Sequence, residues 1–88
     1  MRDINLKVEG KALDYRRAAD LAEARAEREI PGAMLIAWND RKRDLHSPSC
    51  LKCEINNKAG WEVYGHNHGG RLRISINDDD FVFIYGML

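Results

Sequence analysis

The chain has 88 residues, of which 44% are hydrophobic and 32% charged, and its fourteen basic and fourteen acidic residues cancel to a formal net charge of zero. This length corresponds to one small domain, residues 1–88, and the composition excludes a disordered chain, which would hold fewer apolar residues and a larger net charge. A zero net charge removes the whole-molecule attraction to nucleic acid and leaves only a local basic patch to be considered.

The N-terminal segment reads MRDINLKVEG, and no apolar stretch follows Met1 as a secretory signal would require. No run in the chain approaches the roughly 18 apolar residues of a membrane span. We therefore expect a cytoplasmic protein without a membrane partner. Because that compartment is reducing, Cys50 and Cys53 are better interpreted as metal ligands, a redox pair or packing residues than as a disulfide.

The first half of the chain predicts a strand, a helix and a second strand. Residues 3–8 alternate apolar and polar side chains, which indicates a half-buried strand. Residues 11–29 are rich in strong helix formers and carry a face of small residues, and Ile30-Pro31-Gly32 ends the helix. Residues 33–38 (AMLIAW) are apolar throughout, which favours a central strand covered on both faces. This order predicts a right-handed crossover with the two strands parallel.

The second half predicts a series of hairpins. Residues 39–43 form a charged turn, and residues 44–50, with Pro48, form an irregular loop. Short strands are predicted over 51–56, 61–64 (WEVY), 71–77 and 81–85, with turns at 56–60, 65–70 (GHNHGG) and 78–80. The predicted fold class is α+β, with one helix in the N-terminal half packed on a mainly antiparallel sheet, β-α-β followed by a β-meander.

The sharpest chemical feature is the concentration of potential zinc ligands between residues 46 and 68. Zinc takes about four nitrogen or sulfur ligands, and the interpretation uses Cys50, Cys53, His66 and His68, with His46 as a substitute. If the segment 65–70 is extended, His66 and His68 point to the same side and could reach one ion. The alternative is a hairpin turn with two solvated histidines and two cysteines that serve as small packing residues.

Two further interpretations do not involve a metal. On the outward face of the predicted hairpins, Arg71 and Arg73 lie two residues apart and could hold a phosphate or carboxylate, while Tyr64 could stack on a base. This predicts an anion or nucleic-acid binding module. The alternative is an ordinary solvated sheet face. A thiol-dependent enzyme would instead use Cys50 or Cys53 as the nucleophile with His46.

The strands predicted at 33–38 and 81–85 carry apolar residues on both faces. Both faces of the sheet must therefore be covered. One helix covers one face, so a symmetric homodimer or another protein partner would cover the second, and the alternative is that the loop 40–50 folds over it. A domain this small has little room for a substrate pocket. We therefore expect a small binding or accessory protein, with zinc as its candidate cofactor and no catalytic residues assigned.

Overall fold

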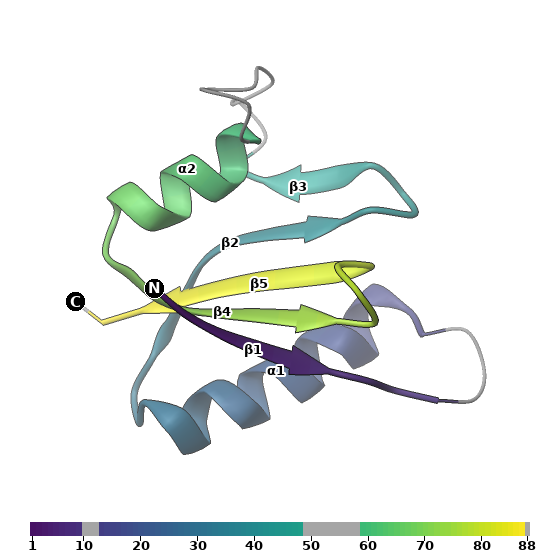
Figure 1. Cartoon of the computed structure of the whole chain (residues 1–88), viewed down its shortest axis with the longest axis horizontal. Coiled ribbons are helices and arrows are strands. Elements are labelled where there is room, and N and C mark those ends of the chain that lie inside the picture. The colour runs from purple at the N-terminus through teal and green to yellow at the C-terminus, as the bar shows by residue number, and fades with distance from the viewer. Residues whose placement is uncertain (10–12, 49–58, 88) are drawn as a thin grey trace.

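The structure is a computed structural model that describes residues 1–9, 13–48 and 59–87 (Figure 1). The described part holds two helices and a sheet of five strands. In chain order the elements are β1 (Arg2–Leu6), α1 (Tyr15–Glu29), β2 (Met34–Asp40), β3 (Leu45–Ser47), α2 (Gly60–Asn67), β4 (Gly70–Ile76) and β5 (Phe81–Gly86). This confirms the predicted α+β class.

The strands of the sheet are ordered β1-β4-β5-β2-β3. Strand β1 runs parallel to β4, with Ile4 opposite Ile74, and the other three pairings are antiparallel. Since β4 and β2 are both antiparallel to β5, strands β1 and β2 point the same way, as the β-α-β pattern predicts. They are not neighbours, however, because the β4–β5 hairpin lies between them (Figure 1).

Helix α1 covers one face of the sheet. Asp14 caps its N-terminus by accepting a hydrogen bond from the Arg17 backbone N–H at 2.8 Å, which satisfies one of the free donors of the first turn. The predicted face of small residues lies against the sheet. Three alanines spaced by four are buried there, and they allow the helix backbone to approach the strands closely. The main core combines Ala18, Ala22 and Ala26 with Ile4, Leu72, Ile74, Ile76, Phe81, Phe83 and Tyr85.

Helix α2 covers part of the opposite face, and the sequence did not predict it. Residues 61–64 were expected to form a strand, but they lie in this helix. Trp61 packs with Ala37 of β2 and with Val82 and Ile84 of β5 in a second, smaller core. The premise that one helix alone covers the sheet is corrected here, because α2 supplies cover over β2 and β5 from within the chain, so this face is no argument for a homodimer.

The end of α2 explains the glycines of GHNHGG, which do not form a hairpin turn. His68 is the C-terminal capping residue, and its backbone N–H donates to the Tyr64 carbonyl at 3.0 Å. Gly69 follows with φ of +89°, the left-handed conformation that commonly terminates helices and that glycine adopts without strain. Gly70 then begins β4.

Two other expectations concern segments 44–50 and 51–56. The segment 44–50 was expected to be irregular, but Leu45–Ser47 forms the edge strand β3, paired with β2. The strand expected at 51–56 lies outside the described residues. Neither of the described helices is long and apolar enough to cross a membrane.

Candidate functional site

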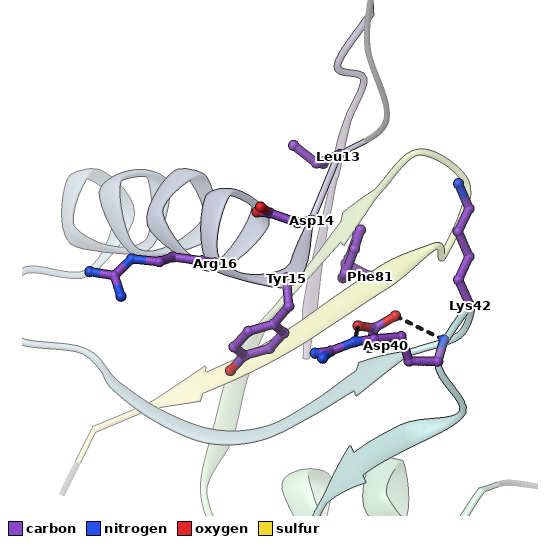
Figure 2. Close-up of a pocket in the computed structure, with 8 residues that line it drawn as sticks. Leu13, Asp14, Tyr15, Arg16, Asp40, Lys42 and Phe81 are labelled. Atoms are coloured by element: carbon purple, nitrogen blue, oxygen red, sulfur yellow. Dashed lines mark hydrogen bonds and ion pairs between the residues drawn. The ribbon is translucent and has the colours of Figure 1, made fainter.

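A cleft of about 480 Å³ opens between the start of α1 and the turn that joins β2 to β3 (Figure 2). Small-molecule sites in proteins usually span about 300–1,000 Å³, so the volume suits a small ligand. Its walls combine apolar or aromatic side chains with charged ones. The residues that line it are Leu13, Asp14, Tyr15, Arg16, Asp40, Lys42, Arg43 and Phe81.

A buried carboxylate forms the polar centre of the cleft. Asp40 ends β2 and is only 1% exposed, although it lines the cavity. Its Oδ2 accepts a hydrogen bond from Arg43 Nε at 2.6 Å, and its Oδ1 accepts one from the Arg43 backbone N–H at 3.3 Å. A buried charge without a partner is costly, so this pairing is what makes the position of Asp40 tolerable.

The pairing leaves most of the Arg43 guanidinium available. The side chain is 56% exposed, and only its Nε is bound to Asp40. Among the described residues, no hydrogen bond or ion pair involves its terminal amino groups. Arg43 is therefore held at one nitrogen, while its side chain lines the cleft and is largely exposed.

Tyr15 forms an aromatic wall beside this pair. Its ring centroid lies 4.6 Å from that of Trp38 and 5.7 Å from that of Phe83, and the Arg43 Cζ lies 5.8 Å from the Tyr15 centroid. Burial raises the pKa of the Tyr15 phenol, which Arg43 partly opposes and Asp40 reinforces. The hydroxyl therefore stays protonated near neutral pH and can donate a hydrogen bond.

The segment that holds the predicted zinc ligands His66 and His68 forms the end of α2 and is not extended. His66 and His68 do not point to one side, because two residues along a helix correspond to about 200° of rotation. His66 is exposed, while the His68 ring stacks on Tyr64 at 3.8 Å with Nδ1 2.9 Å from the Tyr64 carbonyl oxygen. Cys50 and Cys53 lie outside the described residues. No cluster of three or more potential metal ligands occurs in the described ranges.

His46, the substitute ligand, lies on β3 opposite Asn39 of β2. Its side chain is half-buried, and Nε2 is buried without a hydrogen-bond partner among the described residues. The thiol-dependent interpretation pairs this histidine with Cys50 or Cys53, so its geometry is likewise not described.

In the predicted anion site on β4, Arg73 already contacts two carboxylates of the chain itself. Arg73 Nε donates to Glu62 of α2 at 2.8 Å, and its two terminal nitrogens lie 3.3 Å from the two Asp79 carboxylate oxygens. Burial lowers the Arg73 pKa, but these two carboxylates more than compensate, so the pKa is raised overall. Arg73 thus links α2 to the sheet through its hydrogen bond with Glu62. Arg71 is exposed, and the Tyr64 ring is already stacked on the His68 ring.

The cleft was not predicted from the sequence, although one signal was present. Asp40 stands two positions after the apolar run 33–38 and three positions before Arg43, which places a carboxylate at the end of a strand beside a cation. The segment was interpreted only as a charged turn. Its relation to Tyr15 could not be inferred from this spacing, because Tyr15 stands 25 positions before Asp40 and the contact depends on how α1 crosses the sheet.

The fold and the cleft together define a small α+β domain with a helix on each face of a mixed sheet and a charged, partly aromatic cleft at one corner. The chain belongs to the family described as a domain of unknown function, DUF5619, whose model matches residues 1–85. It is similar to a crystal structure of the protein AF1514 from Archeoglobus fulgidus DSM 4304, described as a novel non-family-model protein, with 26% sequence identity and a TM-score of 0.81. That similarity covers 100% of this chain and 95% of the other. A comparison with curated proteins gave no match.

Proposed function

We propose that this protein is a small binding module that takes an anionic small molecule in the cleft beside Arg43. The observation that carries the proposal is the fixed Arg43 guanidinium, held at Nε by the buried Asp40 carboxylate, with both terminal amino groups free of described partners. This arrangement supplies a hydrogen-bonding fork at the mouth of a cavity large enough for a ligand.

Arginine at this position favours a carboxylate or phosphate group. Its planar fork can donate two parallel hydrogen bonds to such a group, which a lysine cannot do with fixed geometry. Ordering a long side chain on binding costs roughly 0.5–1.5 kcal/mol. Because Asp40 already orients Arg43, part of that cost is met by folding, and the free site is prepared for the ligand.

The charge balance of the cleft also favours an anion. Its lining holds three cations, Arg16, Lys42 and Arg43, and two carboxylates, Asp14 and Asp40, which gives a net charge of +1. Asp14 is engaged in capping α1, and Asp40 is neutralised by Arg43. The charges left for a ligand are therefore predominantly positive.

The rest of the ligand is expected to be apolar or aromatic. Leu13, Phe81 and the Tyr15 ring form much of the wall, and an apolar body would cover these surfaces. Figure 2 shows Leu13, Tyr15 and Phe81 around the same space as Asp40. A small aromatic or aliphatic phosphate or carboxylate combines both requirements.

The experiment is a titration of isotope-labelled protein followed by amide NMR shifts, with phenyl phosphate, inorganic phosphate and uncharged phenol as probes. We expect phenyl phosphate to shift signals of the cleft residues and to bind more tightly than either of the other two probes. Arg43→Ala should abolish binding, and Arg43→Lys, which keeps the charge without the fork, should weaken it. Since Arg43→Ala leaves Asp40 unpaired, Arg43→Lys is the variant to use if the first is unstable.

The matched control is Arg71→Ala, which removes an exposed arginine from the β4 face. If Arg43 anchors the anion, the Arg71 variant should bind phenyl phosphate as the wild type does. If binding is instead lost with Arg71→Ala and kept with Arg43→Lys, the anion site is the Arg71, Arg73 and Tyr64 surface indicated by the sequence. Absence of shifts with every probe would refute an anion-binding module.

A second proposal concerns zinc. We propose that Cys50 and Cys53 bind zinc with His46 as a further ligand, in place of His66 and His68. The support is the buried Nε2 of His46, which has no hydrogen-bond partner among the described residues. His46 precedes Cys50 by four residues, whereas His66 lies in α2 and His68 is the capping residue at its end. This site would be structural, since such an ion contributes directly to folding.

A further inference from the structure

One edge of the sheet is formed by β1, which pairs only with β4 among the described residues (Figure 1). The outer edge of an edge strand carries backbone N–H and C=O groups that can pair with another strand. Proteins commonly protect such edges with charged side chains, so the charges on β1 require interpretation. Their arrangement suggests pairing with one particular partner.

The side chains of β1 alternate between the two faces of the sheet. Ile4 is buried under α1, and Arg2 pairs with Glu29 at the end of that helix. Asp3 and Asn5 are exposed, and Lys7, which continues the same alternation, is exposed as well. The face away from α1 therefore carries Asp3, Asn5 and Lys7 in order. The Asp3 carboxylate and the Lys7 ammonium group lie at equal distances along the strand on either side of the Asn5 amide.

We propose that β1 pairs antiparallel with β1 of a second copy of this chain, with the twofold axis at Asn5. In this register Asp3 lies opposite Lys7 of the partner subunit, Lys7 lies opposite Asp3 of the partner subunit, and Ile4 lies opposite Leu6 of the partner subunit. The strand is self-complementary in charge, because each acidic residue meets a basic one and the apolar residues meet on the α1 face. Opposite charges placed directly across two strands are stabilising, and like charges are destabilising.

A cleft of about 300 Å³ beside this edge supports the same partner. It lies between β1 and α1 and is lined by four apolar side chains with a basic rim. Leu21, which lines it from α1, is 38% exposed. Because the twofold axis is perpendicular to the sheet, α1 of the partner subunit would lie on the same side as α1 and cover this cleft. The apolar residues are Leu6, Val8, Leu21 and Ala24, and the basic ones are Lys7, Arg25 and Arg28.

Existing contacts of these charges do not prevent the pairing. Among the described residues, Lys7 has one ionic partner, Asp78 at 3.4 Å, and both side chains are at least three-quarters exposed. Exposed ion pairs of this kind contribute little to stability. Lys7 can therefore exchange Asp78 for Asp3 of the partner subunit at small cost.

The experiment measures self-association of the full chain by sedimentation equilibrium, with charge exchanges at the two positions. We expect the wild type to form a dimer and either Asp3→Lys or Lys7→Asp to raise its Kd by about tenfold or more, since each creates two like-charge contacts. The double variant Asp3→Lys, Lys7→Asp should recover dimerisation. An equimolar mixture of the two single variants should also recover it, because a mixed dimer restores both opposite-charge contacts.

The control is Lys42→Asp, which makes the same charge change as Lys7→Asp on the β2–β3 turn, at the opposite edge of the sheet. It should leave the Kd unchanged, and thermal melting of each variant establishes that the fold is intact. A monomer at all concentrations overturns the proposal. So does a dimer whose Kd is unaffected by either single exchange, since its interface would then lie elsewhere.

Discussion

Gly65 of α2 lies against Ile84 of β5 so closely that a Cβ added to the glycine would stand 2.8 Å from the Ile84 Cδ1 and 3.0 Å from its Cγ2. This contact joins the helix absent from the sequence prediction to the most buried strand of the sheet. It also explains a glycine inside a helix, where glycine is otherwise unfavourable by about 1 kcal/mol relative to alanine.

We expect Gly65→Ala to destabilise the protein, contrary to the usual effect of that change in a helix. Overpacking a closed interface costs roughly 1–3 kcal/mol, which exceeds the gain in helix propensity. For a chain of this size each kcal/mol lost lowers Tm by about 4–8 °C. Thermal melting measures it, with exposed His66→Ala on the same helix as the control. Adding Ile84→Val, which removes Cδ1, should recover part of the loss, and an unchanged Tm for Gly65→Ala would show that α2 does not pack on Ile84.

We propose that Asp40 acts on the ligand by positioning Arg43. The substitution Asp40→Asn distinguishes this role from the effect of the Asp40 charge on the ligand. The substitution removes a negative charge from the cleft, so electrostatics alone would strengthen binding of an anion. We expect the opposite, a Kd for phenyl phosphate raised severalfold, because the amide holds the Arg43 Nε less firmly than the carboxylate. The NMR titration described above measures it, and tighter binding by the variant would contradict a positioning role for Asp40.

The turn between β4 and β5 should contribute a small acid-sensitive part of the stability. The Ser75 hydroxyl lowers the pKa of Asp79 below its ordinary value of 3.8 through a hydrogen bond; partial burial opposes this, and Arg73 reinforces it. A carboxyl group whose pKa is lower in the folded state favours folding when ionised. Its contribution is therefore complete above about pH 5 and is lost as the pH falls through the lowered folded pKa.

Asp79→Asn should flatten the fall of Tm in that acid range and cost a few tenths of a kcal/mol near neutral pH, because the Asp79 side chain is 51% exposed and its interactions are screened. Asp78→Asn is the matched control, since Asp78 is the more exposed neighbour and pairs only weakly with Lys7. Identical pH profiles for the two variants would show that the Ser75 and Arg73 contacts do not stabilise the ionised form.

The zinc content of variants shows which histidine is a zinc ligand. Protein purified without chelator should contain about one zinc per chain, and His46→Ala should lower that content while His66→Ala leaves it unchanged. Elemental analysis measures the metal, and chelator should lower the Tm of the wild type. Wild-type protein free of zinc, with a Tm insensitive to chelator, would end the zinc proposal while leaving the anion-binding proposal untouched.

The strands around Ile4 and Ile74 and the long helix were predicted successfully because their patterns are local. The alternation around Ile4 and Ile74, the alanine-rich helix and its stop at Ile30-Pro31-Gly32 each reflect backbone preferences and one-sided burial that neighbouring residues determine together. The α+β class followed from these long segments. The boundaries shifted by a few residues, as expected where helix and strand ends depend on caps and pairing.

The prediction was wrong for residues 61–64, where four residues alternate in polarity. So short a pattern cannot distinguish a strand from one turn of helix, and Trp61, Val63 and Tyr64 even favour a strand by intrinsic preference. The helix forms because Trp61 and Gly65, four residues apart, present one face to Ala37, Val82 and Ile84. The extended conformation of segment 65–70, on which a common side for His66 and His68 depended, is not formed, because residues 60–67 are helical.

The sequence by itself determined the class of the domain, the small-residue face of α1 and the alternating strands, because these depend on the periodicity of neighbouring side chains. Tertiary structure alone decided that β4 and β5 separate β1 from β2, that Arg73 is paired by Glu62 and Asp79, and that Tyr15 meets Asp40 and Arg43 in one cleft. Each of these contacts joins residues from different elements, and local periodicity carries no information about how the elements cross.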